Sequence, residues 1–344
     1  MINNINKTCV LLVNLGTPKS PKTSDVRKYL FQFLNDKRVI DLPWIIRKIL
    51  VNLIIVPFRA PKSAKVYKEV WTKDGSPIIY HTKNLTKKLN KSLGDNFHVE
   101  YAMRYKNPSI QNALEKIKSK KPRQIIIIPL FPQYASATNG SVIEEVMKNI
   151  KKWWVIPEIN FISQFYNEKL FLDAFADKGR KYKIKDYDEI IFSFHGLPER
   201  HVDKVYENSL CEDNDCEKGI TKLNYFCYKA TCYETAKQIA KRLKIKKSDY
   251  IVSFQSRLDN KWLRPFSDEI IRKKGREGSK KILCFSPSFV ADCLETIIEI
   301  GDEYQEIFEK YGGDKVQLVE SLNDSEKWVE CLKKMVLERT INKN

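Results

Sequence analysis

The sequence lacks several patterns that would assign a function at once. Neither half contains a glycine-rich phosphate loop of the G-x-G-x-x-G or Walker type, and the first loop, residues 14–18, holds one glycine. A nucleotide-dependent oxidoreductase is therefore disfavoured. The first residues do not form the long apolar core of a signal peptide. Because no run of about 18 apolar residues occurs either, we expect a cytoplasmic protein with no membrane span.

Acidic residues are in the minority, with 43 Asp and Glu against 61 Lys and Arg, which gives a formal net charge of +18. Such a surplus is compatible with nucleic acid, an anionic membrane or an anionic small molecule as partner. The lysines are scattered, however, and no basic groove studded with aromatic residues is present. A solvated lysine-rich surface is therefore favoured over a nucleic-acid face.

The order of apolar runs predicts the fold class. Short buried runs alternate with amphipathic helical stretches along 344 residues, which is typical of α/β proteins with parallel sheets covered by helices. The runs form two sets of four, so we expect two doubly wound domains at 1–163 and 164–320, with a C-terminal helix in 321–344 that packs on the first. The predicted strands are 9–15, 97–103, 124–130, 159–163, 189–194, 250–255, 281–285 and 316–319.

His195 stands at the point where a strand ends. The apolar run 190–194 leads up to it, and Gly196 and Pro198 then break the strand. The carboxyl edge of a parallel sheet is where ligands bind, and a neutral imidazole there can accept a proton or bind a metal. Position alone leaves a second interpretation open, namely a histidine that merely ends a strand.

Four cysteines fall within 22 residues of the second half. Cys211, Cys216, Cys227 and Cys232 are separated by four, ten and four residues. Cysteines stay reduced in the cytoplasm, so this spacing predicts a bound metal centre and not disulfides. Zinc knuckles usually place about two to four residues between paired thiolates, whereas a 2Fe–2S cluster accepts looser spacing. Both metals remain open from the residues alone.

Two further stretches have a functional and a plain structural interpretation. Glu295, Glu299 and Glu303 recur every fourth residue after a predicted strand, which stacks them on one helix face. They form either a solvated acidic face or a track that moves protons or hydrated cations. The apolar segment 42–58 is either a buried core helix or a greasy lip that touches a membrane or an apolar ligand.

A set of short motifs occurs in a fixed order along nearly the whole chain. The motifs are Val13-Asn14-Leu15-Gly16-Thr17-Pro18, Asp25-Val26 with Phe33-Leu34, Arg104-Tyr105, Pro132-Gln133-Tyr134, Ser193-Phe194-His195-Gly196-Leu197-Pro198, Phe254-Gln255-Ser256-Arg257, Trp262-Leu263 and Phe289-Val290-Ala291-Asp292-Cys293-Leu294-Glu295-Thr296. Each is weak by itself. Together they resemble the ferrochelatases, the enzymes that insert ferrous iron into a porphyrin.

This resemblance implies two Rossmann-like halves of the chelatase fold around a porphyrin cleft. The implied reaction inserts Fe²⁺ into protoporphyrin IX to give protohaem, the terminal step of haem biosynthesis. His195 would be the active-site histidine and Glu295 its partner carboxylate, and both would meet the Fe²⁺. Asp292, Glu299 and Glu303 would form the acidic track behind them. The implied substrate-binding residues are Leu15, Arg104, Tyr105, Ser193 and Trp262, with Arg104 holding propionates.

The resemblance also bears on the two open segments. Residues 30–58 would supply an apolar lip in peripheral contact with the inner membrane. Several lineages of the family carry a 2Fe–2S cluster, which favours that cluster over zinc in the insertion 207–232, on Cys211, Cys216, Cys227 and Cys232. One known arrangement takes a ligand near position 136 and the rest from a C-terminal tail. It is absent here, because residue 136 is serine and the tail holds only Cys331.

Three other classes of protein could account for parts of the sequence. A chelatase for another ring or metal, such as coproporphyrin III or cobalt, has the same fold and stays open. A nucleic-acid-binding protein with a zinc knuckle is disfavoured, because acidic residues crowd the four cysteines and repel phosphate. A metal-sensing module without turnover is disfavoured by the presence of both His195 and Glu295. The sequence leaves a monomer and a homodimer equally open.

Overall fold

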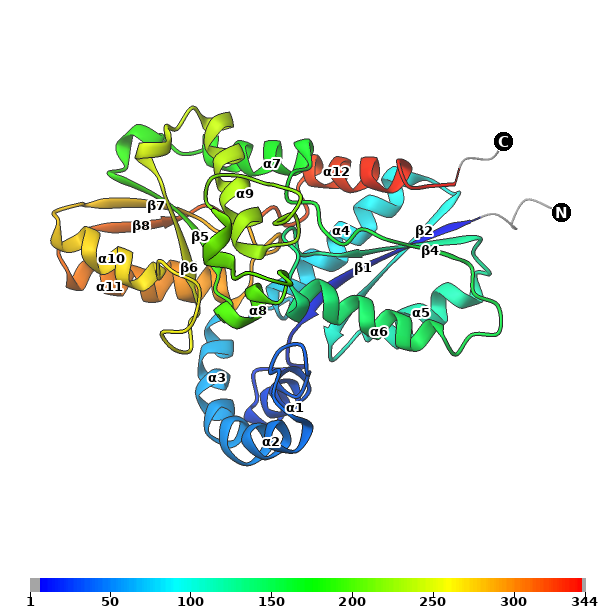
Figure 1. Cartoon of the computed structure of the whole chain (residues 1–344). Helices are drawn as coiled ribbons and strands as arrows, with labels where there is room; N and C mark the ends of the chain where they lie inside the picture. The colour runs from blue at the N-terminus through cyan, green and yellow to red at the C-terminus, as the bar shows by residue number, and fades with distance from the viewer. Residues whose placement is uncertain (1–6, 342–344) are drawn as a thin grey trace. The chain divides into compact units, whose positions relative to one another are not determined.

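The computed structural model describes residues 7–341, and these residues form two units, each built on one parallel sheet (Figure 1). The N-terminal unit comprises the chain up to 131, residues 136–164 and the chain from 323 onward. The C-terminal unit comprises 132–135 and 165–322. The prediction of an α/β fold with two four-stranded parallel sheets is confirmed.

The sheet of the N-terminal unit has the order β2-β1-β3-β4, so β1 lies inside it. Residues 9–13 of β1 and 125–128 of β3 are fully buried. Such continuous apolar runs are what parallel strands covered on both faces require. The strands are β1 (Thr8–Gly16), β2 (Phe97–Tyr105), β3 (Gln124–Pro129) and β4 (Glu158–Phe161).

Helices pack on this sheet in two groups. Cys9, Leu11 and Val13 of β1 form one core cluster with the buried faces of α5 and α6. Helix α4 contacts β1 and β2, and α12 packs on α4. The helical elements of the unit are α1 (Thr23–Leu34), α2 (Trp44–Ile49), the π-helix η1 (Leu50–Ile55), α3 (Val56–Val70), α4 (Pro77–Leu93), α5 (Ile110–Ser119), the π-helical turn η2 (Ser136–Gly140), α6 (Ser141–Ile150) and α12 (Glu326–Leu337).

The carboxyl ends of β1 and β2 approach each other closely at Gly16. Its φ is +112°, and an added Cβ would lie 2.1 Å from the carbonyl oxygen of Tyr105. Only glycine fits this backbone conformation and this contact. The Arg104-Tyr105 motif therefore lies at the same sheet edge as the loop that follows β1.

The C-terminal unit repeats the arrangement with the order β6-β5-β7-β8. His195, the last residue of β5, pairs with Gln255 of β6, and Phe192 pairs with Phe285 of β7. The carboxyl ends of these three strands therefore meet at one edge. The strands are β5 (Glu189–His195), β6 (Ile251–Gln255), β7 (Lys281–Phe285) and β8 (Lys315–Leu318).

Helices cover both faces of this sheet as well. One core cluster joins β5, β7 and β8 to α10, η6 and α11, and Gly179 of α7 packs against Phe285 on β7. The helical elements are α7 (Lys169–Arg180), the short 3₁₀ turns η3 (Ile184–Asp186), η4 (Cys211–Asn214) and η5 (Lys247–Asp249), α8 (Glu199–Asp203), α9 (Tyr228–Leu243), α10 (Ser267–Arg276), the π-helix η6 (Glu295–Glu303) and α11 (Tyr304–Lys310).

The C-terminal residues return to the N-terminal unit. Lys88 Nζ on α4 donates to the carbonyl of Asp324 at 2.7 Å, and Gln124 Nε2 on β3 donates to the carbonyl of Arg339, also at 2.7 Å. Among the described residues, no helix combines the length and the apolar character that crossing a bilayer demands.

Candidate functional site

His195 is held in one orientation by its own neighbour in the chain. Its Nδ1 lies 2.6 Å from the carbonyl oxygen of Gly196. Because a carbonyl oxygen only accepts, Nδ1 must carry the proton, and in the neutral ring Nε2 then keeps its lone pair. The imidazole therefore has one nitrogen committed to the backbone and one able to accept a proton or bind a cation.

The surroundings of this ring are aromatic. The centroids of Trp262 and Phe289 lie 6.4 and 6.2 Å from that of the imidazole. The backbone of His195 is fixed from two sides, because its N–H donates to Ser288 Oγ at 3.2 Å and its carbonyl accepts from the Tyr228 hydroxyl at 2.9 Å. A rigid strand end thus presents the side chain beside two half-buried aromatic rings.

Glu295 opens the π-helix η6, which follows β7. The side-chain amide of Gln255, the residue paired with His195, donates to the carbonyl oxygen of Glu295 at 3.0 Å. This bond ties the start of the helix to the strand end that carries the histidine. Burial raises the pKa of the Cys293 thiol, and the adjacent Glu295 carboxylate raises it further, so this thiol stays protonated and can donate to the carboxylate.

Glu299 is saturated with hydrogen bonds. Its carboxylate accepts from Gln255 Nε2 at 2.9 Å, from the Ser256 N–H at 2.7 Å, from the Ser256 hydroxyl, and from the Tyr304 hydroxyl at 3.2 Å. Together these donors fix the position of the carboxylate. Gln255 and Ser256 belong to one of the sequence motifs, but their role as hydrogen-bond donors to Glu299 was not predicted. Two adjacent polar residues at the end of a strand could have indicated it.

Asp292 has a local structural role. Its Oδ1 accepts from the Thr296 hydroxyl and from the Ser321 N–H, both at 3.1 Å. It therefore joins the loop before η6 to the chain after β8. Glu303 lies at the other end of η6 and is exposed. Glu295, Glu299 and Glu303 all lie on one helical segment, and that segment is a π-helix, a rare geometry that is frequent at functional sites.

Two predicted substrate-binding residues, Ser193 and Leu15, make contacts within the fold. Ser193 is fully buried, and its hydroxyl bonds to Gln255 Oε1 at 2.9 Å and to Ser267 Oγ at 2.8 Å. The expectation that Ser193 contacts substrate is therefore wrong, because its polar atom is used inside the sheet to support Gln255. Leu15 is half-buried and packs against the apolar cluster beneath α1 and η1.

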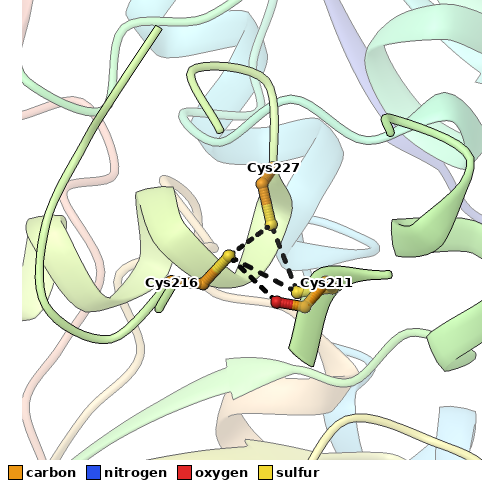
Figure 2. A group of neighbouring side chains, drawn as sticks. All are labelled: Cys211, Cys216 and Cys227. Atoms are coloured by element: carbon orange, nitrogen blue, oxygen red, sulfur yellow. Dashed lines mark hydrogen bonds between the residues drawn. The ribbon is translucent and has the colours of Figure 1, made fainter. Parts of the chain in front are cut away.

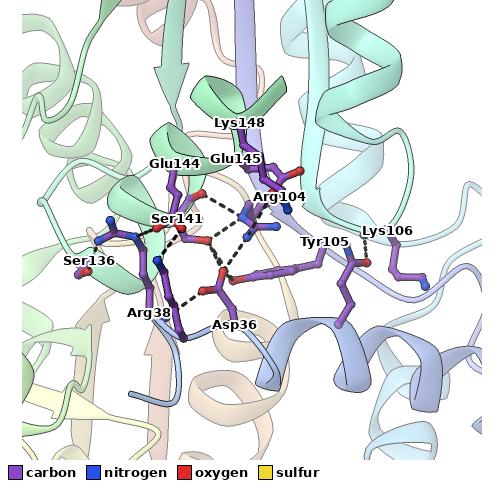
Figure 3. A network of polar contacts seen from close by, with 12 residues as sticks. Asp36, Arg38, Arg104, Tyr105, Lys106, Ser136, Ser141, Glu144, Glu145 and Lys148 are labelled. Carbon is purple, nitrogen blue, oxygen red and sulfur yellow. Dashed lines mark hydrogen bonds and ion pairs between the residues drawn. The ribbon is translucent and has the colours of Figure 1, made fainter. Parts of the chain in front are cut away.

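Arg104 lies in a polar network in the N-terminal unit (Figure 3). Its Nη2 pairs with Asp36 Oδ2 at 2.7 Å, and its Nε donates to Ser141 Oγ at 2.6 Å. The Tyr105 hydroxyl donates to the same Asp36 oxygen at 3.0 Å, and Tyr105 is fully buried. Both residues therefore serve the interior of this unit. The prediction was different: Tyr105 was expected to line the substrate pocket and Arg104 to hold the propionates.

Asp36 is the centre of the network and was missed from the sequence. Burial by itself raises the pKa of this carboxyl group, but hydrogen bonds from Ser141 and the Arg38 N–H, with the charge of Arg104, outweigh burial and lower the pKa. The network joins the loop after α1 to β2 and α6. Its members come from three distant parts of the chain, so no local sequence pattern predicts that they meet.

Replacing Asp36 with alanine should lower the free energy of unfolding by about 2 kcal/mol, because it removes the nearest ionic partner of the half-buried Arg104 and leaves it only Ser141 and Glu145, the latter 4.0 Å away. Urea unfolding measures this. The matched control is Glu277→Ala, which removes a solvent-exposed partner of Lys273 and should change stability by less than about 1 kcal/mol. Since the pKa of Asp36 is lowered from 3.8, the wild type should lose this stabilisation as the pH falls below that value, and Asp36→Ala should not.

Three of the four predicted cysteine ligands converge (Figure 2). The Sγ atoms of Cys211, Cys216 and Cys227 lie 3.5 to 3.6 Å from one another, and all three residues are buried. Among the described residues these three form the one group of histidine, cysteine and carboxylate ligands close enough to hold a metal ion. We refer to them as the thiol triad.

The chain around the thiol triad is well fixed. Cys227 caps α9, where the helix dipole favours a thiolate, and hydrogen bonds from Cys211 and Cys216 lower the pKa of Cys227 to about 3. The Cys211 N–H donates to Asp203 at 2.9 Å, and the Tyr206 hydroxyl lies 3.0 Å from Cys216 Sγ. Asp203 and Tyr206 were not predicted, because only the cysteines carried a recognisable spacing.

Cys232 does not belong to the thiol triad. It is fully buried in the second turn of α9, beside Tyr228. The structure thus brings together three of the predicted ligands and leaves the fourth outside the group.

The segment α2–η1–α3 carries apolar residues on both its buried and its exposed side, and two of its polar residues face inward. Arg47 is buried and donates to the carbonyl of Leu42 at 2.8 Å, and Asn52 accepts from Asn35 at 2.8 Å. Large apolar side chains point outward instead. Those exposed by more than half are Trp44, Ile45, Ile46, Ile49, Leu53, Ile54 and Phe58. We call these seven residues the apolar lip.

Solved structures with a similar fold place this architecture in a known class. A SirB structure from Bacillus subtilis with Fe³⁺ superposes with a TM-score of 0.56 at 11% identity, covering 96% of this chain and 95% of that one. A sirohydrochlorin chelatase SirB from Bacillus subtilis subspecies spizizenii, in complex with cobalt, gives 0.52 at 11% identity, covering 96% and 94%. The fold is therefore the chelatase fold.

Sequence comparison is more specific. The ferrochelatase family model matches residues 7–340. A ferrochelatase of Legionella pneumophila strain Philadelphia 1 is 43% identical over 331 residues, covering 96% of this chain and 98% of its own length. One of Coxiella burnetii strain CbuK_Q154 is 41% identical over 339 residues, covering 97% and 94%. The chain belongs to the ferrochelatase family: it is an enzyme that inserts metal into a porphyrin, with Fe²⁺ as its metal substrate.

Proposed function

We propose that the porphyrin is protoporphyrin IX and that His195 and Glu295 act on it directly. The observation that carries this proposal is the His195 imidazole, whose Nδ1 is bonded to the Gly196 carbonyl so that Nε2 is left as the reactive nitrogen. Gln255 bonds to the backbone of Glu295 and pairs with His195, which keeps the acid and the imidazole at one sheet edge.

The chemistry that these groups must perform follows from the reaction. Two pyrrole N–H protons leave the ring as Fe²⁺ binds the four nitrogens. Neutral His195 accepts one of these protons at Nε2, and the Glu295 carboxylate accepts a proton or guides the cation as it loses water. Trp262 and Phe289, which flank the imidazole, offer apolar surface to a flat macrocycle and exclude water from the reacting nitrogen.

The other family positions take supporting roles in this proposal. Arg104 and Tyr105 are positioning residues that hold the loop after α1 through Asp36. Glu299, with its donors from Gln255, Ser256 and Tyr304, provides a fixed negative charge behind Glu295. Glu303 would supply the outer end of the acidic track, whereas Asp292 anchors its beginning.

We also propose that the thiol triad, with Cys232 as the fourth ligand, holds a 2Fe–2S cluster. Three buried, mutually adjacent thiols at a helix N-terminus suit a centre bound by thiolates. Zinc is the alternative, since it accepts the same donors. A bound cluster would supply a one-electron centre and would cross-link three parts of the loop 207–232. Cys232 would have to turn toward Cys227 to complete the set.

The apolar lip supports a third element of the proposal, a cytoplasmic protein in peripheral contact with the inner membrane. Its buried side packs on α1 through small apolar residues, while seven larger apolar side chains on its other side face outward, which a core helix would not leave exposed. Exposed clusters of this kind mark membrane or partner surfaces.

Steady-state turnover of the purified protein with different porphyrins tests the substrate assignment. Anaerobic Fe²⁺ with protoporphyrin IX should give protohaem at a kcat/KM at least about tenfold above that for coproporphyrin III, which corresponds to about 1.4 kcal/mol of discrimination. Co²⁺ in place of Fe²⁺ tests the metal. A preference for coproporphyrin III of the same size would show that the proposed porphyrin is wrong.

A further inference from the structure

A second exposed apolar surface lies in the N-terminal unit, on the chain between α6 and β4. Trp154, Val155 and Ile156 are 99%, 76% and 53% exposed. Trp153, immediately before them, is buried in the core cluster under α5 and α6. One tryptophan therefore pins the chain while the next is presented to the outside. We call Trp154, Val155 and Ile156 the tryptophan loop.

The position of the tryptophan loop is set by contacts on both sides. The Trp153 N–H donates to the carbonyl of Ile150 at 2.9 Å, and Lys118 Nζ lies 5.6 Å from the centre of the Trp153 ring. On the other side the Glu158 N–H donates to the carbonyl of Arg123 at 3.1 Å, at the start of the β3–β4 pairing. The backbone on both sides of Trp154 is therefore held in place, and this placement leaves the Trp154 side chain exposed.

The surface around the loop is strongly basic. Residues 118–123 and 147–158 meet through the contacts of Trp153 and Glu158, and Glu158 is the only acidic residue in these two stretches. The basic side chains there are all exposed: Lys118, Lys120, Lys121, Arg123, Lys148, Lys151 and Lys152. A second copy of the same face would be repelled by this charge.

We propose that the tryptophan loop and the surrounding lysines dock on an anionic lipid surface. Tryptophan is favoured at the boundary between headgroups and acyl chains, and the aliphatic Val155 and Ile156 gain by leaving water there. Lysines around such an anchor are attracted to anionic headgroups. The loop precedes the first residue of β4, whereas α1 and the apolar lip follow the carboxyl end of β1. The two surfaces are therefore separate, and this proposal does not depend on the lip.

Vesicle flotation tests the proposal on the full-length protein. Vesicles of phosphatidylcholine alone are compared with vesicles containing phosphatidylglycerol, at fixed salt. The wild type should bind the phosphatidylglycerol vesicles more tightly, with a blue shift of its tryptophan emission. The variant Trp154→Ser/Val155→Ser should bind these vesicles about tenfold more weakly and lose much of the blue shift. Lys151→Glu/Lys152→Glu should remove the preference for phosphatidylglycerol.

Two matched variants separate this surface from others. Leu258→Ser removes an apolar side chain that is 72% exposed in the C-terminal unit and should leave binding unchanged. The variant Leu53→Ser/Phe58→Ser removes two side chains of the apolar lip. Adding Trp154→Ser to this variant should weaken vesicle binding further, because the two surfaces act separately. Iron insertion into a water-soluble porphyrin should be unaffected by Trp154→Ser. The proposal is overturned if the loop variant binds vesicles like the wild type, or if the loop is instead needed for self-association or for binding single-stranded nucleic acid.

Discussion

Replacing His195 by alanine is expected to lower kcat for iron insertion by about 100- to 10,000-fold, the range typical of losing a positioned proton acceptor. The variant removes Nε2, which is the nitrogen left over after Nδ1 bonds to the Gly196 carbonyl. The fold should survive, since the backbone N–H and carbonyl of His195 keep their bonds to Ser288 and Tyr228. Haem formation at saturating substrate, with circular dichroism as a check on folding, measures the effect.

A second histidine provides the control for this result. His98 on β2 is partly exposed and bonds to Glu100 at 3.0 Å, far in sequence from the site. His98→Ala should leave kcat within about twofold of the wild type, because it touches no reacting group. Added imidazole should restore part of the activity of His195→Ala. Normal turnover by a folded His195→Ala enzyme would refute the assignment of this residue.

The second large effect is expected at the thiol triad. Changing Cys211, Cys216 or Cys227 to serine should each remove nearly all bound iron and acid-labile sulfide, because a serine hydroxyl is a poor substitute for a thiolate ligand. The anaerobically purified wild type should be brown, and the variants should be colourless. Metal analysis and the visible absorption spectrum report the outcome directly.

Two cysteines outside the thiol triad provide a control and a test of the fourth ligand. Cys331 on α12 is buried in the other unit, so Cys331→Ala should keep the full metal content. Cys232→Ser should lose the cluster if this thiol turns toward Cys227 as the fourth ligand. A colourless wild type that contains zinc and no sulfide would replace the cluster by a zinc site. Retention of colour in Cys216→Ser would refute the triad itself.

The fold was predictable because a strand that is buried on both faces of a sheet is a continuous apolar run in the sequence. Strands such as β1 and β3 are unbroken apolar runs, and the helices between them leave only parallel pairing. The predicted ends differ from the observed ones by two residues at most, from full agreement at 281–285 to 159–163 against Glu158–Phe161. His195 could be placed for the same reason, since it lies between the end of an apolar run and Gly196.

The remaining site could not be predicted because it depends on contacts between distant residues. Asp36, Arg104 and Ser141 meet only after three elements have packed, and Arg104 alone among them stood in a recognised motif. The cysteine spacing indicated four ligands, but Cys232 lies on helix α9 outside the group of thiols close enough to share a metal ion. Hydrophobicity alone could not show that Arg47 and Asn52 face inward in the lip segment.

Gly196 has a consequence for how inactive variants of this enzyme are understood. A Cβ at this residue would lie 2.8 Å from the carbonyl oxygen of Gln255 and 3.2 Å from the Trp262 ring. Even alanine would push these groups apart, and with them the carbonyl that selects the imidazole tautomer. A screen for loss of activity should therefore score this residue as severely as the histidine, although it contributes no functional group of its own.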